Sequence, residues 1–360
     1  MKEMVVAVPN MGPLAIVARG IFKSLGIPIV TVPRITREMI ERGVKYSPEF
    51  ACFPLKAVLG NFMKAAEMGA THLLIFGGGG PCRFGLYGVT LDYILKDLGY
   101  DAKVLIFDTI REEWSKEMYK EIGFLDHRLK IKNMARALFV GYYKLRLAEY
   151  AEKLAGEYRA YQVEKGAVDR VLKEAYQMID EEFSIRRLMK MKKKIKEMFD
   201  KVEKDMSREV VRVGIVGEIY MTVEPTMNLE LERRLGELGA VCDRNITAWN
   251  YVTETLKLNR KYKYVQKLAK PYLKYHAGGK SSYSVGFTID YALKGYDGVV
   301  HIMPFGCMPE IIAQSIINKV SKDYNIPVLE VVLDEHVAEA GLQTRLEAFV
   351  DLLFKRKIKR

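Results

Sequence analysis

Three of the four cysteines stand in similar surroundings, although they are far apart in the sequence. Cys52, Cys82 and Cys307 each lie in a loop rich in glycine or proline that leads into a predicted helix. Unpaired N–H groups at a helix start favour a thiolate, the form of cysteine that binds metals. Three such thiolates, with backbone N–H groups close by, can hold an iron–sulfur cluster. The alternative is that all three are inert buried thiols, because cysteine often behaves as a small hydrophobic residue.

Residues next to these cysteines suit the same chemistry. Gly80 and Gly306 allow the backbone to approach a bulky cluster closely. Arg83 either offsets the negative charge of a cluster or pairs with a surface carboxylate. Glu218 follows a strand that ends in glycine, so it serves either as a catalytic acid or base or as a helix cap.

Other residues have more ordinary interpretations. Cys242 begins a predicted strand, so we expect it to pack in the core. His301 lies within an apolar strand and is expected to be a hydrogen-bonded core histidine. Glu310 follows a proline at a helix start, where capping is the default role. The segment Gly278–Ser281 matches only the end of a phosphate-binding loop and has no strand before it, so we expect no ATP site.

The candidate residues lie in two regions that alternate short apolar strands with helices. The predicted strands are residues 5–8, 29–32, 72–76, 104–107, 211–216, 299–303 and 329–333. The predicted helices are residues 14–25, 55–68, 89–98, 228–238, 310–321 and 342–354. Apolar strands that alternate with helices are typical of parallel sheets covered on both faces. The fold class is therefore α/β, with two doubly wound parallel-sheet domains of the Rossmann or flavodoxin-like kind.

A helical segment separates these two regions. No proline occurs between Pro81 and Pro225, and glycine is rare from Gly99 to Gly214, so residues 112–207 are expected to be mostly helical. Within 183–202, apolar residues recur at the three- and four-residue steps of an amphipathic helix. We predict an N-terminal α/β domain (1–110), a helical segment (111–207) and a C-terminal α/β domain (208–360).

The composition is that of an ordinary globular protein. The 360 residues are 49% hydrophobic and 28% charged, which excludes a disordered chain. The net charge is +12, but residues 186–204 carry +6 of it and residues 355–360 carry +5. These segments lack interleaved aromatic residues, so we expect no nucleic-acid partner. They are either solvated surfaces or a patch that docks an acidic activator or CoA phosphates. No transmembrane segment or signal peptide is apparent, and we expect a cytoplasmic protein without a membrane partner.

The two ends of the chain repeat one pattern of strand, loop and helix. The segment from His72 to Arg83 is matched by the segment from Val299 to Glu310, and each contains a cysteine after the strand. Ligands of open parallel sheets bind outside the carboxyl ends of the strands. We therefore expect the two domains to direct thiols into a shared cleft.

Several motifs, in this order along the chain, resemble the 2-hydroxyacyl-CoA dehydratase superfamily. They are most similar to its shorter members, called CoA-substrate-specific enzyme activases or double-cubane cluster proteins. The motifs that carry the resemblance are residues 46–56, 80–85, 216–220, 305–310 and 334–349.

The resemblance implies an oxygen-sensitive iron–sulfur protein whose cubane [4Fe-4S] cluster is bound by Cys52, Cys82 and Cys307. It also implies electrons of low potential from a separate ATP-hydrolysing activator that carries its own [4Fe-4S] cluster. In the dehydratases these electrons make a ketyl radical from an acyl-CoA thioester, whereas double-cubane proteins reduce small molecules. Family members often have a Gly-Gly-His-Gly run where this chain has Gly278 and Gly279, so these glycines are expected to line the cleft.

The chain departs from the family pattern at two positions. Gly79 stands where many short relatives have a further cysteine, and Lys280 replaces the histidine of the glycine-rich run. With too few thiols for two cubanes, one [4Fe-4S] cluster with an open fourth iron site is expected. The alternative is a double-cubane [8Fe-9S] cluster shared with a partner in a homodimer or heterodimer of homologous subunits. We consider two hypotheses for the function. The chain is either an enzyme, namely a dehydratase-like lyase or an ATP-dependent reductase component, or a non-catalytic electron-transfer subunit.

Overall fold

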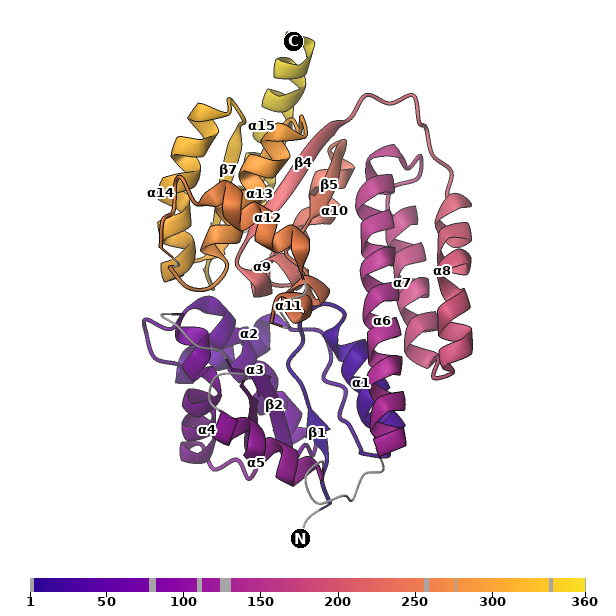
Figure 1. Cartoon of the computed structure of the whole chain (residues 1–360), viewed down its shortest axis with the longest axis vertical. Helices are drawn as coiled ribbons and strands as arrows, with labels where there is room; N and C mark the ends of the chain where they lie inside the picture. The colour runs from indigo at the N-terminus through magenta and orange to yellow at the C-terminus, as the bar shows by residue number, and fades with distance from the viewer. Residues whose placement is uncertain are drawn as a thin grey trace. The chain divides into compact units, whose positions relative to one another are not determined.

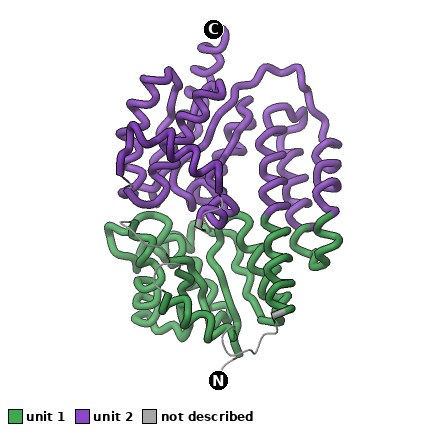
Figure 2. The backbone as a smooth tube through the Cα atoms, in the orientation of Figure 1, with its two compact units in different colours: residues 1–145, 179–189 green, residues 146–178, 190–360 purple. Residues whose placement is uncertain are grey.

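The computed structural model describes residues 3–77, 82–108, 112–123, 131–255, 259–275, 277–336 and 339–359. The chain divides into two compact units (Figure 2). The first contains residues Met1–Leu145 and Ile179–Met189, and the second contains Arg146–Met178 and Lys190–Arg360. Both units draw on the helical middle of the chain.

The first unit is built on a three-stranded parallel sheet. Its strands are β1 (Val6–Ala7), β2 (His72–Phe76) and β3 (Lys103–Phe107), in the order β1-β2-β3. Its helices before the middle block are α1 (Leu14–Leu25), α2 (Arg37–Tyr46), α3 (Phe53–Glu67), the 3-10 turn η1 (Arg83–Leu86) and α4 (Tyr87–Asp97). An isolated parallel bridge joins Val6 to Ile29, on the side of β1 away from β2.

Helices cover both faces of this sheet. Ala18 and Phe22 of α1 share a core cluster with Leu105 of β3 and with α5 (Glu112–Ile122). On the other face, Gly88 of α4 lies so close to Ile106 that a Cβ there would be 2.4 Å from its side chain.

The second unit is built on a four-stranded parallel sheet. Its strands are β4 (Val211–Gly217), β5 (Ala240–Arg244), β6 (Gly298–Pro304) and β7 (Val328–Leu333), in the order β5-β4-β6-β7. Its helices after the middle block are α9 (Ile219–Val223), α10 (Leu231–Glu237), α11 (Ala248–Thr255), α12 (Arg260–Ala269), α13 (Ser281–Leu293), α14 (Met308–Asp323) and α15 (Glu339–Ile358) (Figure 1).

This sheet is also covered on both faces. Helices α12, α13 and α14 form one core cluster with Val216 and Val299. On the other face, Gly298 lies against Phe349 and Leu353 of α15. Both sheets are therefore parallel and doubly wound, which confirms the predicted fold class. The strand order places a topological switch point between β4 and β6, where the connections turn in opposite directions.

The helical middle of the chain is anchored by buried charges. It contains α5, α6 (Ile131–Tyr158), the 3-10 turn η2 (Arg159–Tyr161), α7 (Ala167–Glu181) and α8 (Ile185–Asp200). In the first unit, buried Lys144 donates to the carbonyl oxygen of Asp180 at 2.7 Å, near the end of α7. In the second unit, Arg244 of β5 forms ion pairs with Glu152 of α6 at 2.8 Å and with Glu232 of α10 at 2.7 Å. The first contact joins α6 to α7, and the second ties α6 to β5 and α10 of the second unit.

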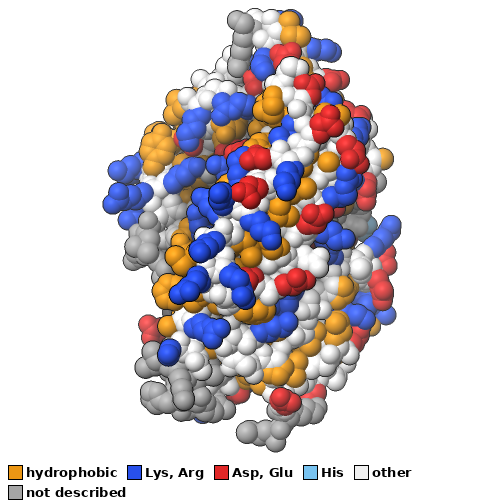
Figure 3. All heavy atoms as spheres, turned by 90° about the vertical axis from the view of Figure 1, so that its right-hand side faces the viewer, with side chains coloured by type: hydrophobic (Ala, Val, Ile, Leu, Met, Phe, Trp, Pro, Cys, Tyr) orange, Lys and Arg blue, Asp and Glu red, His pale blue; other side chains and the backbone are white. Residues whose placement is uncertain are grey.

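Helix α8 is amphipathic, as predicted. Leu188, Ile195 and Phe199 are fully buried, whereas most of its lysine and arginine side chains are exposed. Figure 3 shows the side of the molecule on which α8 lies in Figure 1. The basic side chains on this side are interspersed with acidic and hydrophobic ones. The described helices include none with both the length and the apolar character needed to cross a membrane.

Candidate functional site

Two contacts in the first unit tie the loop of Cys52 to the loop of Cys82. Cys52 directly precedes α3, and its Sγ forms a hydrogen bond with the hydroxyl of Tyr87, the first residue of α4. The Arg83 guanidinium donates a hydrogen bond to the carbonyl oxygen of Phe50. Both thiols are half-buried. The structure thus brings these two predicted ligand loops together and gives Arg83 a backbone carbonyl as a partner.

Gly80, which was predicted to bind the cofactor beside Cys82, lies outside the described residues, as do its neighbours at 78, 79 and 81.

In the second unit, Cys307 is held at the end of β6. Gly306 has a φ of +71°, in the left-handed region that favours glycine. The N–H of Cys307 donates to the carbonyl oxygen of Pro304 at 3.1 Å, and its own carbonyl accepts from Ile311 at 2.9 Å. Cys307 is therefore the residue before α14, and only 7% of it is exposed.

Cys82 and Cys307 occupy corresponding places in the two units. Strand β2 lies beside β1, and strand β6 lies beside β4, which is the first strand of its sheet along the chain. Both β2 and β6 are followed by a cysteine loop and a helix. The helix before β2 begins after Cys52, whereas the helix before β6 begins after Lys280. The second unit thus repeats the arrangement of the first, with a lysine in place of one cysteine.

The predicted set of three ligands spans both units. Cys52 and Cys82 belong to the first unit and Cys307 to the second. Among the residues that the structure describes, no three His, Cys, Asp or Glu side chains form a group that could hold a metal ion. The ligand set therefore stays a prediction.

Cys242 differs from the other cysteines. It lies in β5, is buried, and directs its Sγ at the carbonyl oxygen of Ala240 at 3.7 Å. Burial raises the pKa of this thiol far above its ordinary value. A thiol that stays protonated is a poor metal ligand, as expected for a packing residue.

Glu218 lies at the switch point of the second sheet. It directly follows β4, and its backbone N–H donates to the carbonyl oxygen of Ile302 in β6 at 3.1 Å. Its Oε2 accepts a hydrogen bond from the N–H of Met221 at 3.0 Å, so it caps α9. Burial, assisted by the charge of Glu310, raises the pKa of Glu218 to about 7. The same carboxyl is therefore a helix cap and a group able to hold or release a proton near neutral pH.

Replacing Glu218 by glutamine is expected to stabilise the fold at pH 8 but not at pH 4.5. Because the folded-state pKa is raised from 4.5 to about 7, the wild type loses stability as the pH rises through this interval. Glutamine keeps the cap and does not ionise, so the variant should be more stable by about 2–3 kcal/mol at pH 8. Urea unfolding at both pH values measures the difference. Equal stabilities at pH 8 would show that the pKa is not raised.

The second unit contains two pairs of polar side chains near these positions. His301 is fully buried, and its Nε2 lies 2.9 Å from Oε2 of Glu310, so it is a hydrogen-bonded core histidine as predicted. Glu310, expected only to cap α14, is the partner. Lys280, at the start of α13, pairs with Glu254 of α11. No local pattern indicated the second pair, because its members are joined only by the tertiary fold.

Gly278 and Gly279 lie beside the loop of Cys307. Both have positive φ, +87° and +52°. A Cβ on Gly279 would be 2.9 Å from Cγ of Pro309, two residues after Cys307. The structure therefore packs the predicted glycine turn against the start of α14.

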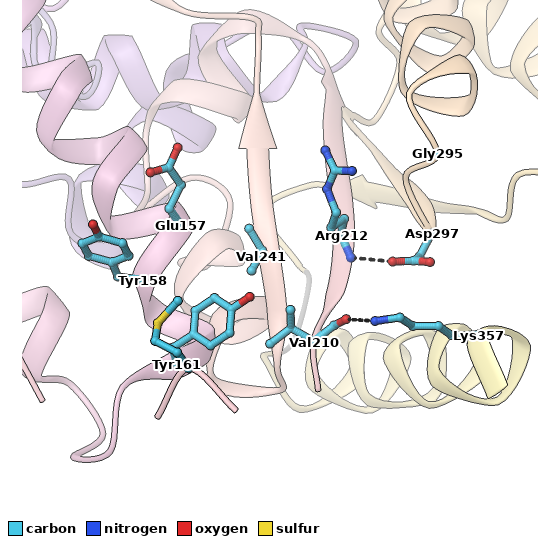
Figure 4. A pocket seen from close by; sticks show the side chains of 10 residues that line it. Glu157, Tyr158, Tyr161, Val210, Arg212, Val241, Gly295, Asp297 and Lys357 are labelled. Atoms are coloured by element: carbon cyan, nitrogen blue, oxygen red, sulfur yellow. Dashed lines mark hydrogen bonds between the residues drawn. The ribbon is translucent and has the colours of Figure 1, made fainter. Parts of the chain in front are cut away.

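A separate pocket opens at the amino ends of the strands of the second sheet (Figure 4). Its volume is about 460 Å³, and it is lined by residues at the starts of β4 and β5, among them Arg212 and Val241. The backbone N–H of Arg212 donates to Asp297 at 2.8 Å, and Lys357 donates to the carbonyl oxygen of Val210 at 2.7 Å. Glu218 and Cys307 follow the carboxyl ends of the strands, so this pocket does not belong to their site.

The sequence matches the family model described as 2-hydroxyglutaryl-CoA dehydratase, D-component, over residues 16–353. The chain belongs to this family. The match to the dehydratase family includes all four cysteines and Glu218, and it confirms the predicted membership of the 2-hydroxyacyl-CoA dehydratase superfamily. Membership identifies the chain as a component of the 2-hydroxyacyl-CoA dehydratase type. A search of curated proteins finds no match.

Proposed function

We propose that the chain is a cytoplasmic iron–sulfur protein that receives low-potential electrons from an ATP-hydrolysing activator with its own [4Fe-4S] cluster. It uses them for reductive or radical chemistry on an acyl-CoA or a small molecule. The observation that carries the proposal is the dehydratase family match over both units. The matched positions of Cys82 and Cys307 after equivalent strands support it.

The donor set fits an iron–sulfur cluster. Cys52, Cys82 and Cys307 each directly precede a helical turn, and none of them uses its side chain to cap that turn. N–H groups at a helix start stabilise the negative charge of thiolates and of a cluster. A bound [4Fe-4S] cluster would supply storage and transfer of one low-potential electron. A double-cubane [8Fe-9S] cluster shared with a partner is the alternative cofactor.

Other residues of the chain would serve this centre through ordinary interactions. Arg83 holds the Cys52 loop by its bond to Phe50, and Gly306 gives the turn before Cys307 its shape. Gly279 lets the backbone lie against the start of α14. Glu218, with a pKa of about 7, holds or releases a proton at its carboxyl group.

Exposed apolar side chains next to the cysteines favour a partner subunit. Phe50 is 87% exposed, Leu86 53% and Phe305 68%. Large apolar groups gathered at ligand loops are typical of surfaces that another protein covers. We therefore propose that the chain forms a homodimer, or a heterodimer with a homologous subunit.

The test of the proposed function is an anaerobic assay with the activator of a dehydratase. The assay mixes the chain with activator, ATP, a strong reductant and 2-hydroxyglutaryl-CoA. This thioester is chosen because the family takes its name from it. We expect ATP-dependent reduction of the chain, seen as bleaching of its visible absorption, whether or not this thioester is the substrate. Turnover only after addition of a homologous subunit would identify a cluster-carrying or half-site subunit. Absence of ATP-dependent reduction would contradict the proposal.

A further inference from the structure

The ammonium group of Lys280 occupies a cage in the second unit. Lys280 is 7% exposed, and its Nζ forms an ion pair with Glu254. Three aromatic rings surround this Nζ, with centroids 4.6 Å away for Tyr251, 5.5 Å for Tyr262 and 5.0 Å for Tyr283. The cage therefore combines one carboxylate with three ring faces that attract a cation.

The polar atoms of the cage satisfy one another. Oε2 of Glu254 accepts from Lys280, and Oε1 accepts from the hydroxyl of Tyr283. Gln266 donates to that hydroxyl at 2.8 Å and so fixes the Tyr283 ring from α12. Burial lowers the pKa of Lys280, and the charge of Glu254 opposes this effect. A buried ion pair adds little net stability, but it specifies one arrangement of the segments that carry it.

The segment that this ion pair fixes is the glycine turn before α13. Lys280 ends the turn, and Oγ of Ser281 donates to the carbonyl oxygen of Gly278 at 2.9 Å. The turn approaches the start of α14 so closely that a Cβ on Gly279 would be 2.9 Å from Pro309. Cys307 lies two residues before Pro309 and is 7% exposed. Contacts therefore lead from the cage, through the turn, to Pro309 at the start of α14, two residues after Cys307.

We propose that Lys280, Glu254 and the three tyrosine rings form a latch, the Lys280 latch, that holds the glycine turn against α14 and limits access to the Cys307 thiol. Lys280 acts here as a positioning residue. The latch needs no cluster to close. Its use in protecting a cluster ligand rests on the proposed function, whereas its effect on the thiol does not.

The test is the rate at which each cysteine of the full-length chain is alkylated. The chain is purified with a chelator, so that the thiols hold no iron, and treated with iodoacetamide under native conditions. Peptide mass spectrometry then gives a separate rate for each cysteine. We expect Lys280→Met to raise the Cys307 rate roughly tenfold or more, because opening of the turn becomes easier. The rates at Cys52 and Cys82 should stay unchanged and serve as internal references.

Two further variants make the result decisive. Glu254→Gln removes the counter-charge at nearly constant volume and should also accelerate alkylation of Cys307. Lys261→Met is the control, because Lys261 also lies over an aromatic ring of this region, that of Phe287 in α13, but contacts Asn245 instead of the turn. It should leave the Cys307 rate unchanged.

An unchanged Cys307 rate in folded Lys280→Met and Glu254→Gln proteins would overturn the latch. Equal acceleration at all four cysteines would also overturn it, because that result indicates general loosening of the fold. If Lys280→Met does not fold, Glu254→Gln alone decides. Since the thiols carry no iron in this assay, its outcome does not depend on whether the proposed cluster exists.

Discussion

Replacing Gly217 by alanine is expected to lower the free energy of unfolding by about 3–5 kcal/mol, the largest loss we expect from one added methyl group. Gly217 ends β4 with a φ of +142°, a conformation that other residues rarely adopt. An added Cβ would be 1.8 Å from the carbonyl oxygen of Ile302 in β6. Because the obstacle is the backbone of a paired strand, it has no side-chain rotation by which to move away.

The loss at Gly217 should come from this clash and not from the positive φ alone. Gly295 supplies the matched control, since its φ is +69° and a Cβ there would meet nothing within 4 Å. Gly295→Ala should therefore cost only about 1 kcal/mol. Guanidinium unfolding followed by circular dichroism measures both variants. Similar losses at the two sites would contradict the packing explanation.

The same substitution should disturb the candidate site. Glu218 follows Gly217 and is held by a backbone hydrogen bond to the same carbonyl oxygen of Ile302. Displacing that contact moves the carboxyl group away from the N–H of Met221, which stabilises its charge. The glycine at the end of β4 is thus a requirement of the fold and of the site together.

The fold class was predictable because its signals are local. The predicted helix at residues 14–25 coincides with α1, which is bounded by Pro13 and Gly26. The predicted strand at 29–32 is instead only a bridge from Ile29 to Val6. Pro28 and Pro33 flank that segment, and proline has no N–H to donate to a sheet. The apolar pattern was right, but the prolines limit its pairing.

Some helices were missed although their caps are visible in the sequence. The side chain of Thr36 accepts a hydrogen bond from Met39 at the start of α2. The side chain of Asn259 does the same for Tyr262 at the start of α12. Both are preferred capping residues, so a search for caps would have indicated these helices.

The site was predictable only in part, because its residues come from distant segments. The loop context singled out Cys52 and Cys82, and the structure shows their loops in contact. Glu218 was recognisable from the glycine before it, but its raised pKa depends on burial and on Glu310, 92 positions later in the chain. The cage around Lys280 needs α11, α12 and α13 to come together, and no short-range pattern reveals this.

The content of iron and acid-labile sulfide per chain tests most directly whether Cys52, Cys82 and Cys307 bind an iron–sulfur cluster. Both are measured after anaerobic purification of the wild type and of four single Cys→Ala variants. We expect about four irons per wild-type chain and nearly complete loss in the variants at positions 52, 82 and 307. Cys242→Ala is the matched control and should keep its iron, because Cys242 is a buried, protonated thiol. An iron-free wild type, or variants at 52, 82 and 307 that keep their iron, would show that these cysteines do not bind a cluster.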